Sequence, residues 1–231
     1  MDDKFYIGGK HSVLSALKNP ERIVHEVYVS RKIKDLSFKK IKEVDQNFFK
    51  KIFKQQDLNH QNIAALVSPL KNNNLKNELE KNEIKKIVIL NGISDPRNIG
   101  SILRSALAFN ITHVIVEKKY FNQKNPIIIK SSSGAIEFLK IIIASNIKNE
   151  IKLLKKNNFL IASFDSNASQ EIRNYDFNEN HALIFGSEGD GIQKSVNDMC
   201  DIKLKISINK KIESLNVSNA VSAILAVINN K

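Results

Sequence analysis

Three segments of the chain place polar side chains where a ligand could bind. They are DPRNIGSILRSA (Asp95–Ala106), IFGSEGDGI (Ile184–Ile192) and KISINKKIESLNVSNAVSAILAVI (Lys205–Ile228), and each begins at or follows a run typical of a buried strand. Together they offer arginines for an anion, a glycine-rich turn that lets a backbone approach a flat ligand, and amides and hydroxyls that can orient one. We therefore expect the chemistry of the protein to lie in these segments.

The first segment holds two arginines in a chain that rarely uses arginine. Only five of the 36 basic residues are Arg, at positions 22, 31, 97, 104 and 173. A planar guanidinium binds phosphate or carboxylate through paired hydrogen bonds, which an ammonium does not. No acidic residue stands three or four positions from Arg104, so a salt bridge within its own helix is disfavoured and we expect an anion contact. For Arg97, a phosphate contact and a structural ion pair are equally open.

The helix that carries these arginines should begin just before them. Asp95, followed by Pro96, fits an N-cap, and Asn98 fits a slightly later one. Arg104 then lies on a stripe with Gly100 and Ala108, off the apolar face, and these small neighbours leave room for a bulky anion.

The other two segments are individually ambiguous. Glu188 stands among three glycines spaced G-x-x-G-x-G, which matches neither the dinucleotide fingerprint nor a phosphate-binding loop, so a flexible turn and a binding loop are equally open. In the third segment Ser214 or Asn216 can cap the helix that follows, and capping does not exclude a second role. The apolar face of that helix is wide enough to be buried by both the core and another subunit.

Alternating strands and helices position these segments. Short apolar runs predict strands at residues 86–90, 113–116, 159–163, 182–185 and 202–207, and the helical stretches between them indicate a parallel sheet. Because ligands bind at the carboxyl ends of such strands, the three segments are expected to meet at one edge of the sheet.

Ahead of this sheet the pattern predicts a smaller α/β module. Residues 23–30 and 62–68 are typical of strands, and residues 12–19 and 33–44 of amphipathic helices. The Asn-rich, charged stretch 70–83 predicts a linker or a short exposed helix. The expected domains are therefore residues 1–70 and 84–231, joined by a linker at 71–83.

The amino-acid composition indicates which classes of partner and site to expect. A formal net charge of +12, spread over both halves, favours a polyanion such as nucleic acid, although a general bias towards Lys, Ile and Asn can also produce it. The single cysteine, Cys200, excludes internal disulfides, and five scattered histidines give no spacing for a metal site. Without a transmembrane run or a signal peptide, we expect a cytoplasmic protein with no membrane partner.

In this order the three segments resemble the motifs of the SpoU (TrmH) family of RNA ribose 2′-O-methyltransferases, in the SPOUT superfamily. The matching stretches are NGISDPRNIGSILRSA, LIFGSEGDGI and ISINKKIESLNVSNA, with SSSGAIEFL (Ser131–Leu139) as a further family segment. The stretches IGGKHSVLSALKN and HQNIAALVSP are similar to the small substrate-binding domain of the bacterial enzymes that methylate a guanosine of 23S rRNA. The resemblance covers nearly the whole chain.

The resemblance implies a fold, a cofactor and partners. We expect an α/β fold with a C-terminal parallel-sheet SPOUT domain containing a trefoil knot, preceded by a small α/β RNA-binding domain. The implied cofactor is S-adenosyl-L-methionine, and the implied partners are RNA rather than DNA, in first place 23S rRNA, and a second copy of the chain in a homodimer. Carried over residue by residue, the catalytic set falls on Asn98, Arg104, Glu188, Ser214 and Asn216, and the cofactor contacts fall on Gly186, Ile206 and Leu215. No metal is implied.

A guanidinium is normally not deprotonated, so we expect Arg104 to hold a phosphate and stabilise the developing alkoxide, with the final proton acceptor left open. Glu188 is expected to organise its loop and pair with a donor, Arg104 among the candidates. Some positions depart from the family pattern: Ser207 replaces a common proline, Asn62 replaces a glycine but can adopt a left-handed conformation, and the turn at Lys210, Lys211 and Glu213 is often made of small residues.

Two other functions stay open at this point. One is methylation of a tRNA ribose, and the other is a non-catalytic RNA-binding role in ribosome assembly. An oxidoreductase with a nucleotide cofactor fits less well, because no glycine fingerprint with a distant acidic residue follows a strand.

Overall fold

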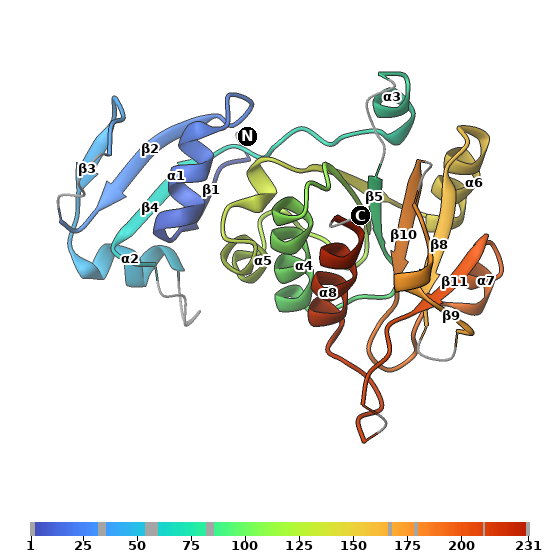
Figure 1. Cartoon of the computed structure of the whole chain (residues 1–231). Helices are drawn as coiled ribbons and strands as arrows, with labels where there is room; N and C mark the ends of the chain where they lie inside the picture. Colours follow the sequence, from blue (N-terminus) through green and yellow to red (C-terminus); the bar gives the residue numbers. More distant parts are fainter. Residues whose placement is uncertain are drawn as a thin grey trace.

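Two β-sheets, each with its own helices, organise the chain (Figure 1). The structure, a computed structural model, describes residues 3–31, 36–53, 60–81, 86–165, 168–177, 180–209 and 211–229. The smaller sheet belongs to the N-terminal part and the larger sheet to the C-terminal part.

The smaller sheet has the order β1-β4-β2-β3. Its strands are β1 (Phe5–Gly8), β2 (Val24–Val29), β3 (Ile41–Glu43) and β4 (Ile63–Val67); only the β2–β3 pair is parallel. Alternate residues of β2 and β4 point to opposite faces. One face packs against α1 (Lys10–Lys18) and the other against α2 (Gln46–Phe53), so both helices are held by the same strands.

The prediction of a helix over residues 33–44 is wrong for residues 36–44, the part that the structure describes. Residues 36–40 are not helical, and Ile41–Glu43 form β3, with Ile41 paired to Val27 of β2. The apolar residues of this stretch, Leu36 and Phe38, pack against the core beside α1. Pairing to a neighbouring strand therefore overrides a helix-like spacing.

The larger sheet is parallel throughout, as predicted. Its order is β7-β6-β5-β10-β8-β11-β9. The strands are β5 (Lys86–Leu90), β6 (His113–Glu117), β7 (Lys140–Ala144), β8 (Leu160–Phe164), β9 (Gln170–Glu171), β10 (His181–Phe185) and β11 (Ile202–Lys205). The five predicted strands are confirmed, while β7 and β9, both at the edges of the sheet, were not predicted.

Helices cover both faces of this sheet. On one face lie α4 (Pro96–Ala108), α5 (Pro126–Ser131) and α8 (Val217–Asn229), and on the other α3 (Leu75–Leu79), α6 (Ile147–Lys156) and α7 (Lys194–Asn197). Two short 3₁₀ helices, Ala135–Glu137 and Ile172–Asn174, complete the described elements. The strand order reverses between β5 and β10, and the loops after these two strands open at this switch point, where α/β sheets bind ligands.

A buried ion pair joins the N-terminal part of the chain to the C-terminal part. The Arg22 guanidinium, after α1, donates from Nε and Nη2 to the two oxygens of Glu137, at 2.9 and 2.8 Å, and the two side chains are 1 % and 2 % exposed. Asn19 donates to the same carboxylate at 3.0 Å, and Arg22 Nη1 donates to the carbonyl of Ser68 at 2.7 Å. We call Arg22 and Glu137 the docking pair.

The stretch between the sheets is not the exposed helix that was one expectation. It contains α3, whose Leu75 and Leu79 are buried in the core beside α6, and Asn73 donates to the carbonyl of Ile141 in β7 at 3.3 Å. The knot implied for the C-terminal segment stays a prediction. In the described part of the chain no helix is both long and apolar enough to cross a membrane.

Candidate active site

The first predicted loop begins α4 as expected. Asp95 is the N-cap, its Oδ1 accepts the backbone N–H of Arg97 at 3.0 Å, and Pro96 is the first helical residue. This cap satisfies one of the free N–H groups at the helix start. Asn98, which follows in the first turn, is thereby fixed at the edge of the sheet beyond β5.

The second loop, after β10, closes on itself. Ser187 and Gly191 exchange two backbone hydrogen bonds of 3.1 Å, and Gly191 has a left-handed φ of 64°. A Cβ added at Gly186 would lie 2.1 Å from the carbonyl carbon of Gly191, so only glycine fits there. The loop is therefore a turn closed by backbone hydrogen bonds, and glycine is required at its start.

Asn91 joins the first two loops. Its side chain is buried, its Oδ1 accepts the backbone N–H of Gln193 at 3.0 Å, and its backbone N–H donates to the carbonyl of Phe185 at 2.9 Å. Sequence reasoning missed this residue. An asparagine directly after a fully apolar strand was the available signal, because a buried amide needs partners.

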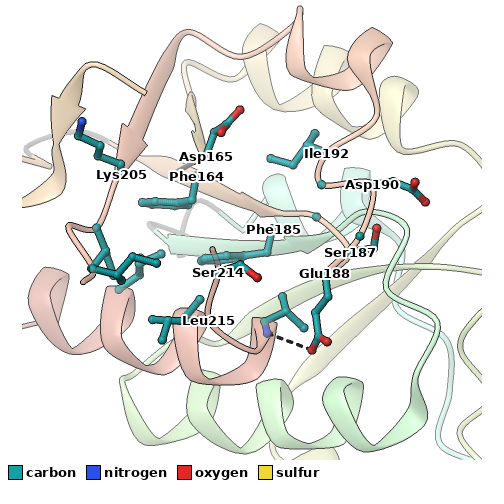
Figure 2. Close-up of a pocket in the computed structure, with 18 residues that line it drawn as sticks. Phe164, Asp165, Phe185, Ser187, Glu188, Asp190, Ile192, Lys205, Ser214 and Leu215 are labelled. Carbon is teal, nitrogen blue, oxygen red and sulfur yellow. Dashed lines mark hydrogen bonds between the residues drawn. The ribbon is translucent and has the colours of Figure 1, made fainter. Parts of the chain in front are cut away.

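Glu188 draws the three loops together. Its Oε1 accepts hydrogen bonds from Asn98 Nδ2 at 3.0 Å and from Asn216 Nδ2. It also accepts the backbone N–H of Val217 at 3.3 Å, the bond drawn as a dashed line in Figure 2. Asn216 Nδ2 also donates to Asn98 Oδ1 at 3.1 Å. We call Asn98, Glu188 and Asn216 the amide–carboxylate cluster. A carboxylate at the start of α8 is favoured by the helix dipole, so the cluster and the helix stabilise each other.

Asn216 has the double role that its sequence position allowed. Its Oδ1 accepts the backbone N–H of Ser218 at 3.0 Å, which caps α8, while its amide nitrogen serves the cluster. Ser214 does not cap the helix; it lines the cavity beside the cluster.

A cavity of about 380 Å³ opens beside the cluster, between the loops after β10 and β11 (Figure 2). All three residues expected to contact a cofactor, Gly186, Ile206 and Leu215, line it. Its apolar wall includes Phe164, whose ring stacks on Phe185 with centroids 5.0 Å apart and an interplanar angle of 8°. The charged side chains around it are Asp165, Glu188, Asp190 and Lys205.

Sequence reasoning missed Phe164, Asp165 and Lys205 as cavity residues. The signal for each was its place at the carboxyl end of a predicted strand, β8 or β11, which is the edge where ligands bind. In the second of these strands the sequence had indicated only Ile206, the residue after Lys205, as a cofactor contact.

Arg104 lies outside the cluster. Its side chain is exposed, it does not line the cavity, and no described residue forms a hydrogen bond or ion pair with it, so the suggested pair with Glu188 is wrong. The prediction that Gly100 leaves room for an anion beside Arg104 is also wrong. A Cβ at Gly100 would lie 1.8 Å from Ser131 Oγ, so Gly100 is buried against α5 and leaves no room for an anion.

The departures from the family pattern have local partners. Ser207 Oγ donates to Glu171 Oε1, which ties the chain after β11 to β9. Asn209 accepts the backbone N–H of Lys211 at 3.0 Å, while Lys210 lies outside the described residues. Asn62 has φ 62°, which confirms the left-handed conformation.

Profiles of two protein families match the chain. The SpoU rRNA methylase family covers residues 85–226, and the family described as RNA 2′-O ribose methyltransferase substrate binding covers residues 6–73. A protein of Staphylococcus aureus (strain MSSA476) assigned to the TrmH family of tRNA/rRNA methyltransferases is 36% identical over 170 residues, which span 72% of this chain and 68% of that protein.

Solved structures share the fold. The SpoU methyltransferase AviRb of Streptomyces viridochromogenes, in complex with the cofactor AdoMet, superposes with a TM-score of 0.81 at 17% identity, over 99% of this chain and 90% of its own. An RNA 2′-O ribose methyltransferase superposes with a TM-score of 0.82 at 20% identity, over 99% and 89%. Because the family profile matches residues 85–226 and the TrmH relative is 36% identical, the chain belongs to the SpoU rRNA methylase family, the TrmH-like methyltransferases.

Proposed function

We propose that this protein transfers the methyl group of S-adenosyl-L-methionine to the 2′-hydroxyl of a ribose in RNA, in first place a guanosine of 23S rRNA. The observation that carries the proposal is the amide–carboxylate cluster. It joins the three loops beside a cavity of ligand size, with Arg104 on the helix that supplies Asn98. The alternative substrate is tRNA, and the S. aureus relative is described for both RNA classes.

The cavity fits the proposed cofactor. Its volume, about 380 Å³, lies within the range of small-molecule sites, and its lining combines an apolar wall with a glycine-rich backbone. Three carboxylates (Asp165, Glu188 and Asp190) and one ammonium (Lys205) surround it, which leaves a net negative lining. Such a lining favours a positively charged sulfonium over the neutral thioether that remains after transfer.

The cofactor, when bound, supplies a methyl group on a positively charged sulfur. The task of the protein is then to position the ribose in line and to stabilise negative charge on its oxygen. Asn98 and Asn216 are oriented by Glu188 and can hold the ribose or the cofactor through their amides. The Arg104 guanidinium holds a phosphate and stabilises the developing alkoxide.

In this proposal residues 1–70 bind the RNA and residues 84–231 catalyse methyl transfer. Residues 71–83 link these two domains. The match of residues 6–73 to a substrate-binding family supports this division. A homodimer is part of the proposal. Ala223, Ala226 and Val227 on α8 are only partly buried within one copy, and they supply an apolar face that a second copy would cover.

The test uses Arg104→Ala and Arg104→Lys. We expect both variants to bind S-adenosyl-L-methionine with unchanged affinity in calorimetry, because Arg104 does not line the cavity. Methyl incorporation into RNA should fall by about 10²-fold or more in Arg104→Ala, which is the scale of losing one transition-state donor. Near-normal turnover would overturn the role of Arg104, and wild-type protein that binds no cofactor would favour the non-catalytic RNA-binding alternative.

The substrate is identified by mapping 2′-O-methyl groups in RNA from cells with and without this protein. Loss of a single site in 23S rRNA is the expected result. Loss of a site in tRNA instead would assign the alternative substrate.

A further inference from the structure

The outward face of α4 carries both of its arginines. Arg97 and Arg104 stand seven positions apart, which is close to two helical turns, so their side chains leave the helix in nearly the same direction. Both are exposed, with Ser101 between them. Figure 1 shows α4 between α5 and α8. The outward face lies between the contact with α5, made at Gly100, and the contact with α8, where the Ser105 and Ser222 hydroxyl oxygens are 2.7 Å apart.

Neither arginine is used to hold the fold. No ion pair or side-chain hydrogen bond of Arg97 or Arg104 is found among the described residues. The nearest carboxylate in sequence, Asp95, accepts the backbone N–H of Arg97 as the helix cap. The ion-pair alternative for Arg97 therefore finds no partner in the described structure.

The position of Arg97 is unfavourable for a cation. It stands in the first turn of α4, where the helix dipole opposes positive charge, and the turn has no acidic side chain of its own. A cation needed only for solubility would most simply be lysine, which makes up 31 of the 36 basic residues of this chain. A guanidinium is the group that binds phosphate through two parallel hydrogen bonds.

We propose that Arg97 binds a phosphate of the RNA strand, and that the outward face of α4 from Arg97 to Arg104 is a track for the sugar-phosphate backbone. The separation of the two residues along the axis is about 10 Å, so they contact different phosphates. Asn98, the next residue after Arg97, belongs to the amide–carboxylate cluster, so the track leads to the proposed site of transfer. The inference rests on the proposed function.

The test measures binding of a fluorescent 20-nucleotide single-stranded RNA of mixed sequence at several salt concentrations. Each phosphate contact contributes about 0.7 to the slope of log K against log[salt]. Arg97→Ala should lower that slope by about 0.7, which corresponds to about fivefold weaker binding at 0.1 M salt that fades as salt approaches 1 M. The double variant with Arg104→Ala should lower the slope by about twice as much.

Lys148→Ala is the matched control. Lys148 occupies the same position in α6, exposed in the first turn with its backbone N–H capped by Asn146 at 3.0 Å, and α6 covers the opposite face of the sheet. The two variants change net charge equally, so we expect Lys148→Ala to leave the slope unchanged. Equal slopes for Arg97→Ala and Lys148→Ala, or no measurable binding by the wild type, would overturn the track.

A second readout separates the track from the proposed function. Arg97→Ala should keep the cofactor affinity and kcat while the KM for RNA rises about fivefold. If the wild type transfers no methyl group but Arg97→Ala still lowers the slope, the proposed function fails and the track stands. If transfer is normal and the slope does not change, the track fails alone.

Discussion

Removing one charge of the docking pair should loosen the N-terminal sheet. Both side chains are almost fully buried, and Glu137 accepts three hydrogen bonds, two from Arg22 and one from Asn19. In Glu137→Gln the Arg22 guanidinium stays buried without a countercharge. Breaking a buried ion pair costs about 3–5 kcal/mol, and because glutamine keeps the shape and one acceptor oxygen, we expect about 3 kcal/mol.

Native-state hydrogen exchange of the β4 amides measures this loss, because it reports the opening of the small sheet separately from the rest of the chain. Glu21→Gln is the matched control. Glu21 pairs with Lys140 across the same contact, but that pair is partly exposed and should contribute about 0–1 kcal/mol.

The result that would refute the reasoning is a Glu137→Gln variant within about 1 kcal/mol of the wild type, since that is the range of an exposed pair. A further check is the double variant Arg22→Met with Glu137→Leu. Replacing both charges with apolar groups should recover most of the lost stability, because no unpaired charge then remains.

Three other predictions concern the site and the pH dependence. Gly186→Ala should abolish S-adenosyl-L-methionine binding in calorimetry, because its Cβ would lie 2.1 Å from a backbone carbon of the same loop; unchanged affinity would contradict this. Glu188→Gln should lower kcat about tenfold or more with little change in melting temperature, because the cluster loses its charged acceptor at an exposed position; an unchanged kcat would contradict this. Burial lowers the pKa of His113 below its usual 6.5, despite its hydrogen bond to Glu78. As the pH falls, the unfolded chain therefore takes up a proton before the folded protein does. The contribution of His113 to the free energy of unfolding is thus fully present above about pH 6.5 and should decrease as the pH falls below it. Urea midpoints between pH 5 and 8 measure this, and His113→Gln should flatten the curve.

The parallel sheet was predictable because its central strands are short, wholly apolar runs. β7 was missed although Ile141–Ile143 are apolar, because this run follows directly on the Ser131–Leu139 segment and was not separated from it. β3 was missed for a different reason. Its residues are all exposed and lack the alternation of a half-buried strand, so only the partner β2 makes them a strand.

The site was predictable as a set of loops but not as a set of contacts. The resemblance to the family motifs pointed to Asn98, Glu188 and Asn216, yet nothing in the sequence said that Glu188 would bond to the two amides and not to Arg104. Those bonds depend on how α4 and α8 cross the sheet, which is a matter of packing. The docking pair was unpredictable for the same reason, since Arg22 and Glu137 are 115 positions apart.

The amide–carboxylate cluster also sets when during synthesis the site can exist. Asn98 and Asn216 are 118 positions apart in the chain. At a translation rate of about 5–20 residues per second, Asn216 is therefore synthesised roughly 6–24 s after Asn98. All strands of the small sheet precede α4 in the chain. The amide–carboxylate cluster, in contrast, is complete only after the start of α8 has been made and has docked beside α4.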